Sequence, residues 1–389
     1  RGAGRHDCPG AAGGHVLRRR RRSLRVGSNT TAQDFLGNSA GYKATIMMNE
    51  LEKLSAEFLP AIEAEMRSVL GADGSSSHAS PFYGMIHYHM GWADENLHPA
   101  QINSGKRIRP LLCLLACAAA GGDWQQAVPA AAAIEILHNF SLVHDDIQDV
   151  SPTRRGRPTL WTIWGQPQAI NTGDAMFAMA HLAMNRLVER GAAPEIVVQA
   201  LRRFDETCVA LTQGQYTDMS FEDRKEVDVA EYIAMITGKT AVLIALSAEL
   251  GALVAGVEDD RVQAFADFGL NLGLAFQVLD DVLGIWGDEV VTGKSVATDI
   301  TTRKKTLPVL YGLPRNQALR ELYDGDATDG EFVRQVVALL DDAGARAYTI
   351  NEAERYTRQA TSSLIVAQPS GSAAEALDIL TGILLRRDF

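Results

Sequence analysis

Apolar side chains recur at intervals of three and four residues along most of this chain. Leu51, Leu54 and Phe58 show the pattern within residues 47–70, and such spacing places apolar side chains on one face of a helix. No convincing run alternates between apolar and polar residues, as a half-buried strand would. The sequence therefore predicts an all-α protein. Further helical runs are expected at 107–120, 126–148, 169–190, 194–218, 228–255, 259–285, 330–343 and 348–366, with a closing helix to about residue 386.

Only short breaks at Gly and Pro separate these runs. The 389 residues are enough for two domains, but one large helical domain over residues 47–389 is the simplest arrangement. An aromatic content of 7% and an abundance of Ala, Leu, Glu and Arg also favour helices over sheets.

Residues 1–46 differ from the rest of the chain. They include five consecutive arginines, 18–22, and residues 1–47 hold nine Lys or Arg against two Asp or Glu. We expect this segment to be disordered. A basic, acid-poor leader is typical of organelle transit peptides, and translated upstream or vector-derived sequence has the same character. The bacterial style of the remainder favours a cytoplasmic protein.

The formal net charge is −11 in spite of this basic leader. An acidic body argues against nucleic acid as the main partner, since binding to a phosphate backbone needs a basic face. The most apolar stretch, 241–256, contains Glu249 and is shorter than a membrane span, so no integral membrane segment is predicted. The cysteines lack zinc-type spacing, and we expect buried free thiols. They are Cys8, Cys113, Cys117 and Cys208.

Two pairs of carboxylates end long apolar runs. Asp145 and Asp149 are four residues apart and therefore share a helix face. Carboxylates this close repel each other unless a cation neutralises them, and magnesium bridging to phosphate oxygens would do so. A solvated acidic helix end is the alternative. Because Asp280 and Asp281 end a second apolar helix, the two pairs together predict carboxylates facing each other across a helical cavity.

Cations stand near these motifs in the sequence. Arg forks match phosphate oxygens and Lys supplies a compact charge, so they are suited to a diphosphate. Taken singly, each is more commonly a surface residue. Their positions beside a helix start and the first acidic motif favour the pairs Lys106 with Arg109 and Arg154 with Arg155. The other candidates are Lys239, Lys294, Lys304 and Lys305.

In this order, the motifs resemble those of the trans-isoprenyl diphosphate synthases, the polyprenyl synthetase family that includes farnesyl and geranylgeranyl diphosphate synthases. The resemblance runs from about Glu50 to the C-terminus. It implies a helical bundle of the isoprenoid synthase type with a central apolar cavity. The motifs are Gly-Lys-Arg-Ile-Arg-Pro at 105–110, Asp-Asp-Ile-Gln-Asp at 145–149 with Arg154 and Arg155, Gly-Lys-Thr at 238–240, Phe-Gln-Val-Leu-Asp-Asp at 276–281, Thr-Gly-Lys at 292–294 and Lys-Lys-Thr-Leu-Pro at 304–308.

The resemblance also implies the reaction and the role of each residue. The reaction is a head-to-tail, trans condensation of isopentenyl diphosphate with an allylic diphosphate, with three Mg²⁺ ions per site once diphosphate is bound. Asp145, Asp149 and Asp280 are expected to bind the metal, supported by Asp146 and Asp281. Arg154, Lys239, Thr240, Gln277 and Lys294 are expected to contact the allylic diphosphate. Lys106, Arg109, His138 and Arg155 are expected to hold isopentenyl diphosphate, with Lys304 closing over the site; between Lys304 and Lys305 the sequence does not choose.

One position departs from the family pattern. The second acidic motif commonly ends in a third acid, and this chain has Gly284 there. Because the first acid of the motif carries most of the metal contact, we expect activity to survive with altered metal affinity or turnover. Asp288 is expected to compensate in part from the following turn.

Product length is expected to follow from the depth of the apolar cavity beneath Asp145. His138 and Ser141 fall on the same helical stripe as Asp145, so Ser141 opens the cavity wall. Phe140 is the bulky residue that the family's chain-length rules single out, and it implies a C20 or C15 product. Ordinary core packing is the alternative for Phe140.

Two other functions were weighed. A terpene cyclase on a related fold also ionises allylic diphosphates, but it does not need the second diphosphate site formed by Lys106, Arg109, His138 and Arg155. A regulatory subunit without catalysis is expected to lose the first acidic motif, which is intact, although Gly284 keeps this reading open. The family is usually a homodimer, so a homodimer is expected.

Overall fold

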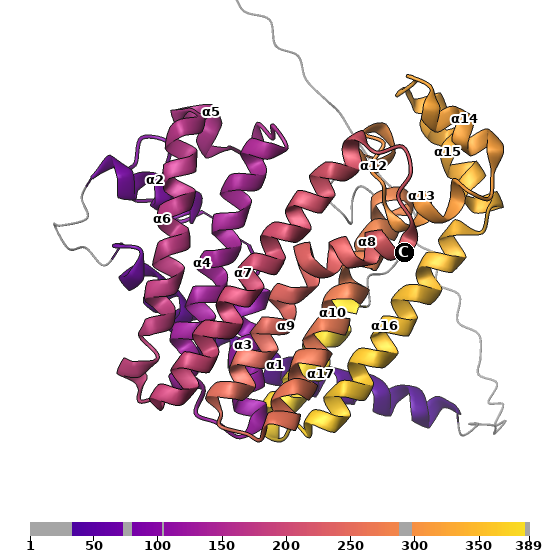
Figure 1. The fold of residues 1–389 in the computed structure, drawn as a ribbon. Helices are drawn as coiled ribbons and strands as arrows, with labels where there is room; N and C mark the ends of the chain where they lie inside the picture. Colours follow the sequence, from indigo (N-terminus) through magenta and orange to yellow (C-terminus); the bar gives the residue numbers. More distant parts are fainter. Residues whose placement is uncertain (1–32, 73–79, 103–104, 288–297, 386–389) are drawn as a thin grey trace, which may run out of the picture. The chain divides into compact units, whose positions relative to one another are not determined.

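The computed structural model describes residues 33–72, 80–102, 105–287 and 298–385, with side chains from residue 50 onwards except at residues 223 and 298. The chain divides into two compact units, residues 1–44 and 45–389. The account below concerns the second unit (Figure 1).

The described part of the chain is almost entirely helical, which confirms the predicted all-α class. The first half contains α1 (Gln33–Val69), α2 (Pro81–His89), α3 (Ile108–Ala120), α4 (Trp124–Gln148), β1 (Thr153–Arg154), β2 (Arg157–Pro158), α5 (Leu160–Trp164), α6 (Gln166–Asn185), η2 (Val188–Arg190) and α7 (Pro194–Asp223). The second half contains α8 (Val229–Ile236), the π-helical segment η3 (Thr237–Ala241), α9 (Val242–Val254), α10 (Asp259–Trp286), α12 (Thr298–Thr301), α13 (Leu307–Gly312), α14 (Gln317–Asp324), α15 (Gly330–Asp342), α16 (Ala345–Ala367) and α17 (Gly371–Leu385).

The first helix begins earlier than the sequence predicts. We expected helix from residue 47 and disorder before it, whereas α1 begins at Gln33. No Pro occurs between Gln33 and Met47, so nothing in this stretch prevents a helix from continuing towards the N-terminus. Residues 1–32 lie outside the described residues.

Helix α9 lies at the centre of the bundle, because it contacts α3, α4, α7 and α10. Helix α10 packs most extensively against α16 and α9, while α4 packs against α6 and α3 (Figure 1). The main apolar core includes Phe58, Phe204 and Phe265, which are fully buried. Cys113, Cys117 and Cys208 are buried free thiols, as predicted, and Cys8 lies outside the described residues.

Two described stretches, Val229–Val254 and Asp259–Trp286, are long and apolar enough to cross a membrane by length and composition alone. Of their most apolar windows, 50% and 67% respectively are buried inside the protein. Since α9 and α10 are central helices of the bundle, core burial accounts for their apolar character. No membrane-spanning segment is clearly indicated in the described ranges.

A short hairpin interrupts the helices after α4. Thr153 pairs with Pro158 and Arg154 with Arg157, and the two residues between the strands, Arg155 and Gly156, both have positive φ. Such a two-residue turn matches the natural twist of paired strands. The sequence predicted neither this hairpin nor the short helices α2, α5 and α12 to α14, because segments of this length carry too few repeats of any pattern.

Candidate functional site

The first acidic motif lies in the last turn of α4, in a part of the helix that is partly buried. Asp123 caps the start of the helix by accepting a hydrogen bond from the Gln125 backbone N–H (3.0 Å), and Asp149 ends it. Carboxylates at a C-terminus face the negative end of the helix dipole, an arrangement that favours a bound cation. Burial raises the pKa of Asp145 to about 6; Lys239 opposes the shift and Asp149 adds to it.

A close approach of two helices brings Lys239 to this motif. Gly214 of α7 lies directly against the backbone of Gly238 and Lys239, and a Cβ at position 214 would overlap the Lys239 amide nitrogen. One turn after Gly214, Asp218 forms an ion pair with Lys239. The π-helical segment η3 presents this lysine, and such segments are frequent at functional sites. Lys239 thus stands between Asp218 of α7 and Asp145 of α4.

Lys304 lies among carboxylates from several elements. Burial lowers its pKa, but the nearby charges of Asp218, Asp299, Asp281 and Asp149 outweigh this, and the pKa is raised. These acids come from α7, α12, α10 and the end of α4. Carboxylates of both predicted acidic motifs, Asp149 and Asp281, therefore lie near one lysine. We name Asp145, Asp149, Asp218, Asp280, Asp281 and Asp299 the acidic cluster.

The structure also separates the two neighbouring lysines. The Lys305 ammonium donates to the backbone carbonyl oxygens of Phe221 and Glu222, which belong to the last turn of α7. A lysine in this position satisfies carbonyl groups at a helix end. Lys305 is thus a capping residue, while Lys304 faces the acidic cluster.

In the second acidic motif, Asp281 turns into the protein. It accepts hydrogen bonds from the Tyr232 hydroxyl (2.5 Å), the Leu307 backbone N–H (3.0 Å) and Gln277 Nε2 (3.3 Å). Burial raises its pKa to about 7, although these three donors favour the ionised form. Thr240 donates to Gln277 Oε1 (3.1 Å), which links η3 to α10. Asp281 thus holds the motif in place, and Asp280, which precedes it, is only partly buried.

The side-chain position missing at Gly284 is occupied by another carboxylate. A Cβ added to Gly284 would overlap Oδ2 of Asp299, which comes from α12. Position 284 lies one turn after Asp280 on the same helix face. An acid therefore stands where the sequence pattern has none, although it comes from a different helix. Asp288, which we expected to compensate, lies outside the described residues.

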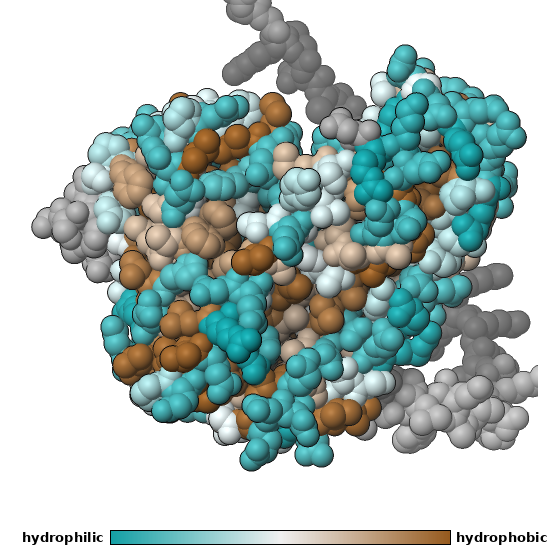
Figure 2. All heavy atoms as spheres, in the orientation of Figure 1, coloured by the Kyte–Doolittle hydropathy of each residue, from teal (hydrophilic) through white to brown (hydrophobic). Residues whose placement is uncertain are grey.

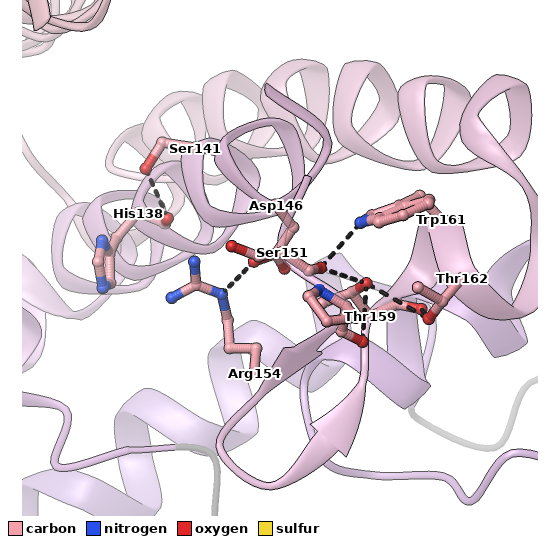
Figure 3. Close-up of polar contacts among 9 residues, drawn as sticks. His138, Ser141, Asp146, Ser151, Arg154, Thr159, Trp161 and Thr162 are labelled. Atoms are coloured by element: carbon pink, nitrogen blue, oxygen red, sulfur yellow. Dashed lines mark hydrogen bonds and ion pairs between the residues drawn. The ribbon is translucent and has the colours of Figure 1, made fainter. Parts of the chain in front are cut away.

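The hairpin after α4 carries Arg154 back towards the first acidic motif. Arg154 Nε donates to Asp146 Oδ1 at 2.7 Å (Figure 3). The fold of this segment is fixed at Ser151, whose carbonyl oxygen accepts from Thr159 Oγ1 (3.0 Å) and Trp161 Nε1 (2.9 Å). Burial raises the pKa of Asp146, and Arg154 opposes the rise. Like Asp281, Asp146 is buried and supports its motif from within.

Beside this hairpin, α3 and α4 bring further cations together. Arg109 Nη1 lies 3.3 Å from His138 Nε2. The Arg155 guanidinium packs against Gly105, where a Cβ would lie 3.0 Å from Nη2. Burial and the charges of Arg109 and Arg155 hold the pKa of His138 well below its usual range, so His138 is neutral at pH 7. Four predicted residues thus meet, and we name Arg109, His138, Arg154 and Arg155 the basic cluster.

The remaining predicted residues differ in their surroundings. Lys106 is exposed, and Lys294 lies outside the described residues. Arg107 forms ion pairs with Glu135 (2.7 Å) and Glu63 (3.7 Å), which gives it a structural role. The sequence analysis missed Glu135, Asp218 and Asp299, because a single acid on a helix carries no pattern that separates it from a solvated one.

Phe140 lies at the contact between α4 and α6. Its ring centroid is 5.0 Å from that of Phe177 and 4.9 Å from that of His144. The Ser141 hydroxyl donates to the His138 carbonyl oxygen of its own helix at 2.9 Å (Figure 3). The packing of Phe140 fits both expectations stated for it, a limit on product growth and ordinary core packing.

The acidic cluster suits a metal that is shared with a ligand. Among the described residues, no three His, Cys, Asp or Glu side chains lie close enough together to hold a metal ion by themselves. Magnesium is usually bound through one or two carboxylates together with substrate phosphates and water. Hard oxygen donors spread over several helices fit that mode and do not fit a closed all-protein metal cage.

Comparison with known proteins agrees with this arrangement. Residues 91–340 match the family model described as polyprenyl synthetase. The (2E,6E)-farnesyl diphosphate synthase of Mycobacterium tuberculosis is 39% identical over 326 residues, covering 81% of this chain and 88% of that protein. The geranylgeranyl diphosphate synthase of the same organism is 38% identical over 343 residues, covering 87% and 93%.

A solved structure shares the fold as well. The polyprenyl synthase of Caulobacter crescentus CB15, crystallised with calcium and isoprenyl diphosphate, superposes with a TM-score of 0.73 at 28% identity, covering 88% of this chain and 98% of that one. The family match spans more than half of the chain, and the relatives exceed 30% identity over more than two thirds of it. The chain therefore belongs to the polyprenyl synthetase family.

Proposed function

We propose that the protein is a magnesium-dependent trans-prenyltransferase that joins isopentenyl diphosphate to an allylic diphosphate. The product is short, geranylgeranyl diphosphate (C20) or farnesyl diphosphate (C15), in keeping with the names of the two mycobacterial relatives. One observation carries the proposal: the first acidic motif and the basic cluster are adjacent, and the ion pair between Asp146 of that motif and Arg154 joins them.

Each cluster is assigned one diphosphate, except that Arg154 of the basic cluster contacts the diphosphate held at the acidic cluster. Asp145, Asp149 and Asp280 would hold the Mg²⁺ ions, three per site, and Lys239 would contact the allylic diphosphate beside them. The Caulobacter relative was crystallised with calcium and isoprenyl diphosphate, which supports the use of a divalent cation together with a diphosphate. Asp218 and Asp299 add to the charge around Lys239 and Lys304. The remaining contacts to the allylic diphosphate come from Arg154, Thr240, Gln277 and Lys294.

The basic cluster receives isopentenyl diphosphate. Arg109, His138 and Arg155 contact its phosphate oxygens, and Lys106 approaches from the exposed side. Because Arg forks bind phosphate oxygens in pairs, this site fixes the orientation of the double bond relative to the allylic carbon. It needs no metal, since guanidinium groups supply the charge.

The reaction is an ionisation followed by an alkylation. When bound, magnesium supplies positive charge to the departing diphosphate and so lowers the barrier to C–O cleavage. Lys239 and Arg154 stabilise the same developing charge from the protein. The double bond of isopentenyl diphosphate then attacks the allylic carbon, and the proton lost from that adduct passes to the released diphosphate. Apolar walls exclude water, which would otherwise capture the allylic cation.

The proposal is tested by product analysis. Purified protein is incubated with MgCl₂, isopentenyl diphosphate and a C5, C10 or C15 allylic diphosphate in turn, and the dephosphorylated alcohols are sized by chromatography. We expect C15 or C20 alcohols only when both substrates and magnesium are present. Consumption of the allylic substrate at the same rate without isopentenyl diphosphate would indicate a cyclase. No consumption by the folded protein would indicate a subunit without catalysis.

We also propose a cytoplasmic homodimer, with residues 47–389 as the catalytic domain and residues 1–46 outside it. The dimer has support from exposed apolar side chains on two adjacent helices. On the face shown in Figure 2, apolar residues are interspersed with hydrophilic ones over the region of α6 and α7. The exposed apolar residues of these helices include Ile170, Leu182, Val198, Val209, Tyr216 and Met219. Sedimentation of the full chain tests the assembly, and a monomer at micromolar concentration contradicts it.

A further inference from the structure

A histidine that the sequence analysis did not single out lies next to the basic cluster. His89 is the last residue of α2, and its Nε2 atom is buried without a hydrogen-bond partner. The Nε atom of Arg109 is in the same condition. Buried polar atoms are normally hydrogen-bonded, and leaving one unpaired destabilises the folded protein. Two such nitrogens near one group of cations indicate that a ligand with several acceptor atoms belongs there.

The residues around His89 indicate that this ligand is negatively charged. His89 lines a pocket of about 30 Å³ together with Arg154, Arg155 and Arg157. Burial and the charges of Arg155, Arg154, Arg107 and Arg157 lower the pKa of His89 to about 3. The imidazole is therefore neutral at pH 7, and it offers an N–H donor without adding another positive charge to a crowded site.

Acids balance only part of this charge. Glu135 pairs with Arg107, and Asp146 pairs with Arg154. Arg157 donates hydrogen bonds to the backbone carbonyl oxygens of Tyr88 and Ala93, both at 3.0 Å, and no acid neutralises its charge in these contacts. The group around His89 thus holds more cations than acids, and an oxyanion would offset the excess.

We propose that His89 is a further ligand of the diphosphate of isopentenyl diphosphate, donating a hydrogen bond from Nε2 to a phosphate oxygen beside Arg109, His138 and Arg155. This inference rests on the proposed function and assigns one more residue to the same substrate site. A water molecule held in the pocket is the structural alternative, because the volume is large enough for one.

The experiment removes the Nε2–H donor of His89 and keeps a flat ring at this position. His89→Phe retains a flat ring without an N–H, and His89→Gln places an amide N–H near the original Nε2. Isopentenyl diphosphate is titrated calorimetrically into each full-length protein in EDTA, so that no metal holds a diphosphate at the acidic cluster. We expect His89→Phe to weaken binding about tenfold to a hundredfold, the cost of a hydrogen bond to a charged group, and His89→Gln to recover part of it.

Kinetics separate a ligand from a structural role. The KM for isopentenyl diphosphate should rise by a similar factor in His89→Phe, while the KM for the allylic diphosphate stays within twofold of the parent. His98→Phe is the matched control, because that side chain is 75% exposed on the loop after α2. If His89→Phe fails to melt cooperatively, His89→Leu replaces it.

Two outcomes overturn the inference: unchanged binding of isopentenyl diphosphate by His89→Phe, or an equal rise in the KM of both substrates, as a held water or a packing role would give. These results are distinct from failure of the proposed function. In that case the parent protein itself neither binds isopentenyl diphosphate nor makes a prenyl product.

Discussion

The acidic cluster and the basic cluster hold buried charge in opposite ways. The acids come from four elements, α4, α7, α10 and α12, and two lysines, Lys239 and Lys304, lie among them. The residues of the basic cluster come from α3, α4 and one hairpin, and the acids Glu135 and Asp146 act on the charges of its arginines. Each cluster therefore keeps an excess of one sign, and each is expected to bind a ligand of the other sign.

The comparison explains why two similar substrates need different treatment. A cluster with excess carboxylate can hold a diphosphate only through divalent cations, and these also promote departure of the diphosphate. A cluster with excess guanidinium holds a diphosphate directly and leaves its C–O bond intact. On the proposed assignment, the protein activates one diphosphate and only orients the other.

The largest effect is expected at the acidic cluster. Asp145→Ala should lower turnover about a hundredfold to a thousandfold, because losing one group that stabilises developing charge costs roughly 3–4 kcal/mol. Binding of isopentenyl diphosphate in EDTA should be unchanged. Asp205→Ala, an exposed acid paired with His181, is the control. Turnover by Asp145→Ala at the parental rate with magnesium present contradicts the metal assignment.

The second prediction concerns Asp299, whose carboxylate lies where a side chain at Gly284 would be. Asp299→Asn should weaken Mn²⁺ binding in the presence of inorganic diphosphate about tenfold, as removal of supporting groups around a metal does. In Asp299→Ala, where the overlapping side chain is gone, adding Gly284→Asp puts a carboxylate back on the same helix face and should restore part of the affinity. Electron paramagnetic resonance of free Mn²⁺ measures both. Equal affinity in the parent and Asp299→Asn refutes a role for Asp299.

The cations around His89, next to the basic cluster, should make the stability of the folded protein depend on pH. His89 has a pKa of about 3 in the folded protein and the ordinary value of 6.5 when unfolded. Below pH 6.5 the unfolded chain takes up a proton that folded His89 does not, so stability falls as pH falls. Between pH 6.5 and 5.5 this costs about 1 kcal/mol, because the unfolded imidazole is already half protonated at pH 6.5. We expect urea unfolding to show that the free energy of unfolding falls less in His89→Phe than in the parent between these two pH values, by that amount. An identical fall in both proteins contradicts a neutral His89.

The smallest effect on rate is expected at Phe140, which belongs to neither cluster. Phe140→Ala removes a ring that packs on Phe177 and should lengthen the product by one or more C5 units, with turnover within a few-fold of the parent. Phe204→Leu, in the core around α7, is the packing control. An unchanged product from Phe140→Ala leaves core packing as the role of this residue.

The helices and both acidic motifs could be predicted from the sequence, since spacing within one helix determines which residues share a face. Asp145 and Asp149 are an example. Spacing cannot predict which helices meet. Gly214 and Gly238 let α7 touch η3, which brings Asp218 to Lys239, and the sequence holds no local sign of this contact.

The same limit applies to the second acidic motif. In the sequence, Gly284 is a missing acid, because the motif describes only one helix. In the structure, the carboxylate of Asp299 reaches that place from α12. His89 also escaped notice, since a lone histidine at the end of a short helix is commonplace and only its buried, unpartnered Nε2 distinguishes it.

The most direct test of two clusters with two kinds of ligand is a crystal grown with Mn²⁺, isopentenyl diphosphate and a non-ionising thio analogue of an allylic diphosphate. Anomalous scattering should place Mn²⁺ between the allylic diphosphate and the carboxylates of Asp145 and Asp280, at about 2.0–2.2 Å. The second diphosphate should lie against Arg109 and Arg155 without metal. Metal at the basic cluster, or none at the acidic cluster in the ternary complex, would contradict the account.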